Sequence, residues 1–147
     1  MTPTAATALP DLDHELVATR RVLERVPDDA LDWRPHEKSR TLAELATHLV
    51  SVQAFGTGLL TAEGFWFEDY VEFPTPKSRA ALLDRWDGVA AQFREAAEAS
   101  DLPASRYADV RRYVLGHNGH HRGQLTVYLR LLDVPLPKVY GPTADES

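Results

Sequence analysis

The fold is decided by residues 110–132, which read VRRYVLGHNGHHRGQLTVYLRLL. Side chains three or four positions apart share one face of a helix, so the period of the apolar residues reveals the buried face. This stretch is therefore predicted to lie in a helix from about Ser105 to Leu132, which the prolines at positions 135 and 137 stop. The buried face is expected to comprise Val110, Val114, His117, His121, Leu125, Tyr128 and Leu132.

Three more amphipathic helices are expected before it. The first begins near Asp11 and ends at Pro27. The second begins at Thr41, which forms a T-x-x-E pattern with Glu44. This pattern is typical of a capping box, in which each side chain accepts a hydrogen bond from the other residue's backbone N–H. The third follows Ser78, a good N-cap residue. Each helix has apolar residues at helical spacing and therefore one face to bury.

The connection between the second and third helices, Glu63 to Lys77, is long and rich in aromatic residues. Aromatic rings gain by burial, so we expect this segment to fold onto the helices. The chain shows no long β-type alternation and no internal repeat. We therefore predict an all-α protein with a single domain, residues 1–147. Its expected architecture is an antiparallel four-helix bundle with a long crossover loop between helices 2 and 3. Residues 1–10 and 134–147 are expected to be largely irregular.

Composition excludes several classes of protein. The chain has 147 residues, 22 acidic residues against 16 Lys and Arg, a formal charge of −6 and no cysteine. Without cysteine it has no disulfide, iron–sulfur cluster, cysteine-ligated zinc or cysteine nucleophile. The acidic charge argues against nucleic-acid binding, and no apolar run approaches the roughly 18 residues of a membrane helix. The first ten residues lack the features of a secretory signal. We therefore expect a cytoplasmic protein with neither nucleic acid nor membrane as partner.

Three histidines are predicted to share the interior. His117 and His121 lie four residues apart, which places their imidazoles one helical turn apart on the buried face. His48 lies on the apolar face of the second helix. A single buried histidine, or such a pair alone, is more often structural, but burying three imidazoles without partners is costly. A shared divalent metal would satisfy all three, so we predict that His48, His117 and His121 are metal ligands.

The residues around the histidines narrow the type of metal site. A zincin has glutamate directly after the first histidine, and here that position is Asn118. No carboxylate accompanies the histidines in the local pattern, which disfavours a 2-His-1-carboxylate iron site. Three protein ligands leave an open position, as in catalytic metal sites. Gln124 is a candidate to contact the predicted ligands from outside the metal centre. His120 either has the same role or lies at the surface. The catalytic residues stay unknown, because no general base is evident.

The opposite side of the last helix carries an arginine and three glycines. Arg122 points away from the histidines, so we expect a structural role in an ion pair or a helix contact. Gly116, Gly119 and Gly123 share that side, although each glycine costs up to about 1 kcal/mol against alanine within a helix. One interpretation is that packing compensates for a weak stretch. The other is that a second backbone approaches closely there, from this chain or from another subunit.

Four motifs together resemble the DinB-like family of damage-inducible, metal-binding helical proteins. They are residues 33–38 (WRPHEK), 42–48 (LAELATH), 117–125 (HNGHHRGQL) and 140–142 (YGP). The resemblance covers nearly the whole chain. Asp133 departs from the pattern, because similar sequences usually carry glycine there, which bears on how the last helix ends.

The resemblance implies both a cofactor and a chemistry. It implies a four-helix bundle that holds a divalent metal, nickel or zinc, through His48, His117 and His121, and a homodimer as the assembly. Better-understood members are transferases or isomerases that use low-molecular-weight thiols such as mycothiol or bacillithiol.

A thiol-dependent enzyme is accordingly the leading functional hypothesis. A free thiol has a pKa near 8.5 and is deprotonated when it coordinates a metal dication. We predict a metal-dependent thiol S-transferase, or a related enzyme, acting on a small-molecule substrate. The thiol would be a co-substrate, because the chain has no cysteine. The alternatives are a hydrolase that uses a metal-bound water and a metal-binding stress-response protein without enzymatic activity.

Overall fold

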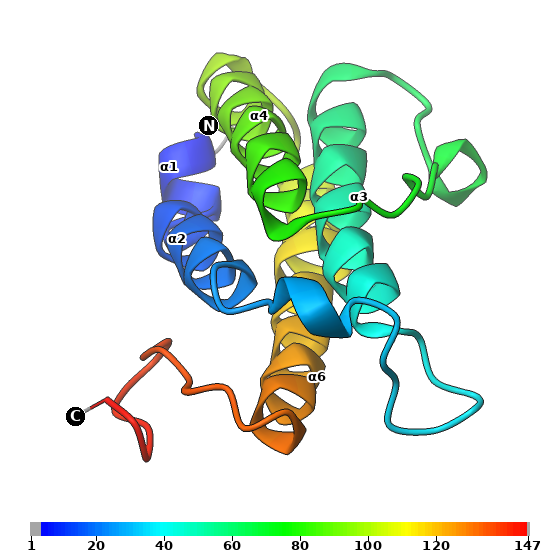
Figure 1. Ribbon diagram of the computed structural model, residues 1–147. Coiled ribbons are helices and arrows are strands. Elements are labelled where there is room, and N and C mark those ends of the chain that lie inside the picture. The colour runs from blue at the N-terminus through cyan, green and yellow to red at the C-terminus, as the bar shows by residue number, and fades with distance from the viewer. Residues whose placement is uncertain (1–3, 147) are drawn as a thin grey trace.

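The computed structural model describes residues 4–146, and every regular element within them is helical (Figure 1). The predicted all-α class is thus confirmed. None of the described helices is long and apolar enough to span a membrane. In chain order the elements are α1 (Ala5–Ala8), α2 (Leu12–Leu23), the 3-10 helix η1 (Asp28–Ala30), α3 (Leu42–Thr61), the 3-10 helix η2 (Phe67–Asp69), α4 (Arg79–Ala99), α5 (Ala104–Val110), the π-helical stretch η3 (Arg111–Gly116) and α6 (His117–Leu131).

Four long helical segments pack side by side: α2, α3, α4 and the continuous run from α5 through η3 to α6 (Figure 1). α3 contacts both α4 and α6, and α2 contacts the same two helices. Ion pairs from Arg20 to Asp87 and from Arg94 to Asp13 show that α2 and α4 are antiparallel. The four segments therefore form a bundle around one shared core.

Contacts between the helices show in which direction each of the four segments runs. Hydrogen bonds from Arg106 to the carbonyl of Leu59, and from the Tyr128 hydroxyl to the carbonyl of Arg40, make the last segment antiparallel to α3. α2 and α6 run in the same direction, and so do α3 and α4 (Figure 1). The antiparallel arrangement thus applies to the α2–α4 and α3–α6 pairs. Because α3 and α4 are parallel, the chain must return along α3 before α4 begins, which explains the long crossover.

The predicted helix starts are present and held by their caps. Thr41 Oγ1 accepts a hydrogen bond from the N–H of Glu44 at 3.1 Å, and the Glu44 carboxylate accepts one from the N–H of Thr41 at 3.1 Å. Ser78 Oγ accepts one from the N–H of Ala81 at 3.1 Å. Local sequence therefore fixes where α3 and α4 begin.

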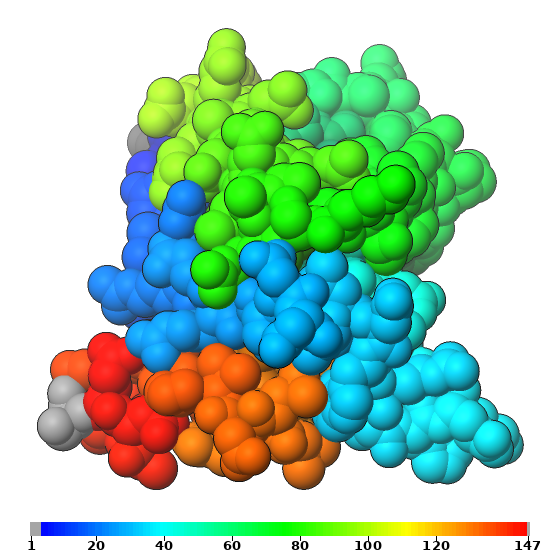
Figure 2. Space-filling view, in the orientation of Figure 1, coloured from blue at the N-terminus to red at the C-terminus, as the bar shows by residue number. Residues whose placement is uncertain are grey.

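Both ends of the described chain pack on the bundle. The prediction that residues 1–10 are largely irregular is wrong for the part that the structure describes, because Ala5–Ala8 form a helical turn and the following Leu9 is buried in the core. Residues 1–3 lie outside the described residues. Residues 134–146 contain no helix, as expected, but ion pairs hold them in place: Arg25 with Glu146 at 3.0 Å and Arg130 with Asp145 at 2.6 Å. Figure 2 shows this tail, in red, lying against the end of α6.

The predicted helix from about Ser105 to Leu132 is present but not uniform. α5 passes into the π-helical stretch directly before His117. A π-helical turn holds more residues than an α-helical one, so it rotates the side chains of α6 about the helix axis relative to those of α5. A Cβ added at Gly116 would lie 3.1 Å from the carbonyl oxygen of Arg111. Gly116 therefore has a local explanation, which is room for the wide turn.

No second backbone of the described chain approaches Gly119 or Gly123, the two glycines of α6. The atoms nearest to a Cβ added at Gly119 belong to the side chains of Arg122 and Tyr140, at 3.9 and 4.0 Å. A Cβ added at Gly123 would have no neighbour within 4 Å. Close approach of another segment of the described chain is therefore wrong as an explanation for these residues.

Gly56 is the glycine at which the helices do meet. A Cβ added there would lie 2.8 Å from the ring of Phe93 and 2.9 Å from the side chain of Val114. Both of those residues are fully buried. Gly56 thus lets α3 lie close to α4 and to the last segment at once, and this packing holds α3 beside the histidines of α6.

The last helix ends in a Schellman motif in which Asp133 takes the left-handed conformation, with a φ of 60°. The N–H of Val134 donates to the carbonyl of Leu129 at 2.9 Å, and the N–H of Asp133 donates to the carbonyl of Arg130 at 3.1 Å. Glycine is usual at such a position because a Cβ is strained at positive φ. Asp133 therefore preserves the helix end that glycine would give, but with strain.

Asp133→Gly is expected to stabilise the protein by about 0.5 kcal/mol, because relief of the left-handed strain outweighs the extra freedom of glycine in the unfolded chain. Urea unfolding measures the difference. Asp29→Gly is the matched control, since this aspartate lies in η1 without a positive φ, and it should lower the stability. A less stable Asp133→Gly protein would show that strain at this position is not the dominant effect.

Candidate metal centre

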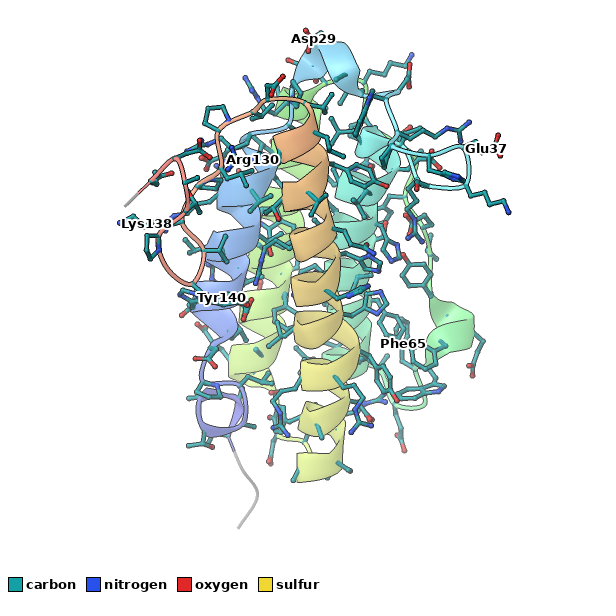
Figure 3. The ribbon with its side chains drawn as sticks, turned by 90° about the horizontal axis from the view of Figure 1, so that it is seen from below. Asp29, Glu37, Phe65, Arg130, Lys138 and Tyr140 are labelled. Carbon is teal, nitrogen blue, oxygen red and sulfur yellow. The ribbon has the colours of Figure 1, made fainter. Side chains whose placement is uncertain are left out.

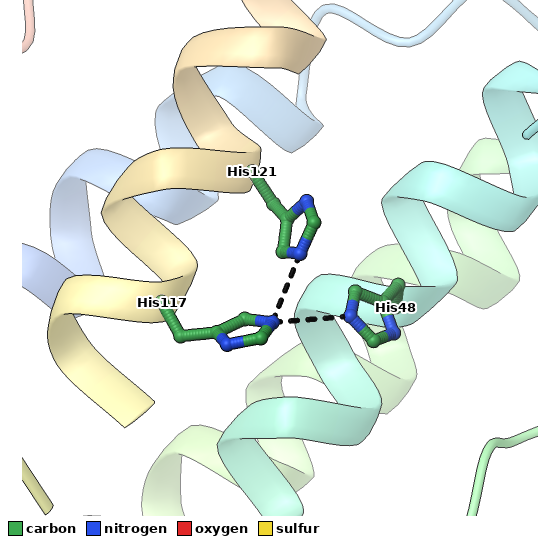
Figure 4. A group of neighbouring side chains, drawn as sticks. All are labelled: His48, His117 and His121. Atoms are coloured by element: carbon green, nitrogen blue, oxygen red, sulfur yellow. Dashed lines mark hydrogen bonds between the residues drawn. The ribbon is translucent and has the colours of Figure 1, made fainter. Parts of the chain in front are cut away.

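The three predicted ligands meet between α3 and α6 (Figure 4). His48 comes from α3, and His117 and His121 come from the first two turns of α6. Nε2 of His117 lies 3.3 Å from Nε2 of His48 and 2.9 Å from Nε2 of His121. One ring nitrogen of each residue lies within 4.8 Å of the other two. The structure therefore brings together the three histidines that the sequence singled out.

The hydrogen bonds of two rings leave their Nε2 lone pairs facing the centre. Nδ1 of His48 lies 3.0 Å from Glu72 Oε2, and Nδ1 of His121 lies 2.7 Å from Gln124 Oε1. Both oxygens accept, so both Nδ1 atoms carry a hydrogen, and in the neutral form of each ring Nε2 then presents a lone pair. His117 Nε2 faces both lone pairs and offers one hydrogen at most. At least one of the two contacts of His117 Nε2, with His48 or with His121, therefore has no hydrogen between the two nitrogens. A cation bound between the rings would remove this repulsion between lone pairs.

The spacing of the three nitrogens also suits a metal ion. Zinc–nitrogen bonds of about 2.0–2.1 Å in a tetrahedron place the ligand nitrogens roughly 3.3–3.4 Å apart. The observed separations of 2.9 and 3.3 Å come close to this value. Among the described residues the group contains no carboxylate. A metal ion held here would have three imidazole ligands and a further position for another molecule.

Burial keeps the rings of His117 and His121 in the form that can bind metal. His48 and His121 are 8% and 9% exposed, whereas His117 is the most accessible of the three. Loss of water lowers the pKa of His121 to about 4 and also lowers the pKa of His117, and the neighbouring histidines act in the same direction. Both rings are therefore neutral at pH 7, and a metal need not displace a proton from them.

Two crossover residues that sequence analysis missed complete the surroundings of His48. The Tyr70 hydroxyl lies 3.0 Å from His48 Nδ1 and donates to Glu72 Oε2. Burial and the contact with Glu72 raise the pKa of Tyr70, so its hydroxyl stays protonated. The local pattern holds no carboxylate, yet Glu72 arrives from 24 residues further along the chain. No local pattern of the sequence points to Tyr70 or Glu72, because both reach His48 from a segment more than 20 residues away.

The other candidate residues take different positions. Gln124 contacts His121 through its side-chain oxygen. His120 is exposed, and its ring centroid lies 5.1 Å from that of His121. Asn118, at the position of the zincin glutamate, is buried and donates to the carbonyl of Leu49 at 3.0 Å and to Gln53 Oε1 at 3.2 Å. Asn118 thus fastens α6 to α3 at the level of the histidines.

Comparisons with known proteins place the chain in a family. Residues 11–125 match the family model of the DinB superfamily. The uncharacterized protein YrdA of Bacillus subtilis (strain 168) is 24% identical over 148 residues, which cover 91% of this chain and 86% of that protein. A crystal structure of a DinB-like protein from Bacillus cereus ATCC 10987 matches with a TM-score of 0.72 and 28% sequence identity, covering 95% of this chain and 100% of that one. These matches confirm the resemblance drawn from the four motifs: the chain belongs to the DinB superfamily.

Proposed function

We propose that the protein is a metal-dependent enzyme that activates a low-molecular-weight thiol and transfers it to a small electrophilic molecule, or uses it in a related reaction. The observation that carries this proposal is the convergence of three Nε2 atoms, with no carboxylate among them, at the accessible side of His117. His48, His117 and His121 would hold one divalent metal ion. Imidazole ligands suit zinc and nickel.

The metal ion would activate the thiol, and the protein would hold the metal and leave a path for the substrate. A free thiol has a pKa of about 8.5. A dication held by three neutral imidazoles would lower the pKa of a thiol bound to it. Glu72 and Gln124 contact two of the proposed ligand rings at their Nδ1 atoms. The more accessible His117 marks the side from which a small molecule can enter. The thiol must come from outside, because the chain has no cysteine.

Hydrolysis is the main competing function, and the carboxylates argue against it. An enzyme that activates water gains from a general base within hydrogen-bond reach of that water. Glu72 Oε2 contacts the histidines, but it already accepts from Nδ1 of His48 and from Tyr70, on the outer side of the ring. A thiol has a free pKa of about 8.5, against about 15.7 for water, so on a metal it ionises more readily than water and can release its proton to solvent without such a base. In the alternative of a stress-response protein without enzymatic activity, the metal would only stabilise the bundle and would need no open coordination position.

The thiol hypothesis predicts that conjugation of an electrophile such as monochlorobimane accelerates only when metal-loaded protein and a thiol are both present. Mycothiol and bacillithiol would be compared by fluorescence with zinc- and nickel-loaded protein. His121→Ala protein, treated identically, should give only the uncatalysed rate, because it lacks one of the three proposed ligands. Turnover of an ester by the loaded protein without any thiol would instead identify a hydrolase.

A further inference from the structure

The crossover is in direct contact with the proposed metal centre. Figure 3 shows it, with Phe65 labelled, along the side of α3 that faces away from α2. Residues 70–76 contain neither helix nor strand, and the backbone of Tyr70 is extended. Tyr70 and Glu72 reach Nδ1 of His48, and the N–H of Phe73 donates to Ser51 Oγ at 3.0 Å, one turn further along α3. The crossover is thus docked on the helix that carries His48, at the level of that residue.

We propose that Glu72, held in place by Tyr70, is a positioning residue of the metal centre, which makes the crossover part of the site. This inference rests on the proposed function, since it assumes that the three histidines bind a metal. Glu72 would act through His48, by accepting the Nδ1 hydrogen and turning the Nε2 lone pair toward the other two ligands. The Glu72 carboxylate would not itself bind the metal, because it contacts Nδ1, on the far side of the His48 ring from Nε2.

His48 has a charged hydrogen-bond acceptor at Nδ1, unlike His121. Gln124 offers His121 a neutral amide oxygen, whereas Glu72 offers His48 a charged acceptor, and charged acceptors make the stronger hydrogen bonds. A carboxylate on Nδ1 fixes the tautomer and the ring orientation and raises the basicity of Nε2. Glu72 also adds a negative charge close to a centre whose ligands are all neutral. Tyr70 restrains that carboxylate by donating to its Oε2.

Zinc affinity tests the proposal. Zn²⁺ binding would be measured by competition with a chromophoric chelator for the wild-type protein and three variants. Glu72→Ala is expected to bind about 10–100-fold more weakly, the usual effect of losing such a partner. Glu72→Gln keeps an oxygen that can accept from Nδ1 and should recover part of the loss. Glu68→Gln, an exposed position in η2 of the same crossover, is the matched control and should bind like the wild type.

The tautomer of His48 provides a readout that needs no metal. Two-bond ¹H–¹⁵N correlation spectra of the metal-free protein distinguish Nδ1–H rings from Nε2–H rings. The wild-type protein should show His48 with Nδ1–H, and Glu72→Ala should shift it toward Nε2–H. The unfolding temperatures of the metal-free proteins show whether each variant is folded.

The outcomes separate the two hypotheses. Zinc binding that Glu72→Ala leaves unchanged overturns the positioning role but preserves the metal centre. A wild-type protein that binds neither zinc nor nickel overturns both. A wild-type His48 with Nε2–H in the metal-free protein overturns the positioning role whatever the affinity.

Discussion

His121→Ala protein, purified without chelators, is expected to contain only traces of metal, and the wild-type protein is expected to hold about one ion per chain. The substitution removes the ligand whose Nε2 lies 2.9 Å from that of His117 and leaves two imidazoles. Zinc sites with four protein ligands bind with roughly 10–16 kcal/mol, so losing one ligand should weaken binding by about 100-fold or more. Mass spectrometry of the metal content after dialysis measures the result.

His120→Ala is the matched control, because it removes the same side chain at the adjacent position. His120 is exposed, and its imidazole is not among the three that converge. This variant should retain its metal, and chelation should lower the unfolding temperature of this variant and of the wild type alike, since a ligand that binds only the folded state stabilises it. Chelation should leave the unfolding temperature of His121→Ala unchanged. Full metal occupancy in His121→Ala, or its loss in His120→Ala, would mean that the ligands are assigned wrongly.

Features of the fold that depend on local chemistry could be predicted from the sequence. The capping box of Thr41 and Glu44 and the N-cap of Ser78 depend on residues three positions apart, and they are present as predicted. The relative direction of α3 and α4 depends on how a long crossover packs, which no local pattern encodes. The π-helical stretch was missed for a related reason: its residues have the composition of an ordinary helix, and Gly116 was interpreted as a packing signal.

The same division applies to the candidate site. Helical period alone placed His117 and His121 on one face and His48 on a buried face, and the structure brings these three together. Glu72 and Tyr70 escaped prediction because they contact His48 from a segment more than 20 residues away, where neither helical nor strand period relates one residue to the other. Contacts of that kind depend on the tertiary path of the crossover, so the sequence singled out the three histidines but missed the carboxylate that contacts His48.

A buried ion pair on the other side of α6 gives the prediction with the largest expected effect on stability. The side chain of Arg122 is 3% exposed and lies 2.8 Å from Glu15 Oε2 of α2, whose side chain is 18% exposed. Arg122 also donates to Thr19 Oγ1 at 3.1 Å and to the hydroxyl of Tyr140, which itself donates to Glu15. The expected ion pair or helix contact of Arg122 is thus present, and it joins α6, α2 and the C-terminal tail.

Glu15→Leu is expected to destabilise the protein by about 3–5 kcal/mol, because it leaves the Arg122 guanidinium buried without a counter-ion. The double variant Glu15→Leu/Arg122→Met replaces both charges by apolar side chains and should recover most of that loss, since desolvation of the pair largely offsets its attraction. Urea unfolding of the single and double variants measures the coupling, and additive effects would show that the pair is not coupled. Figure 3 places Tyr140 and the crossover residue Phe65 on opposite sides of α6. The zinc affinity of the double variant should therefore equal that of the wild type, which separates the structural role of this ion pair from the proposed role of the histidines.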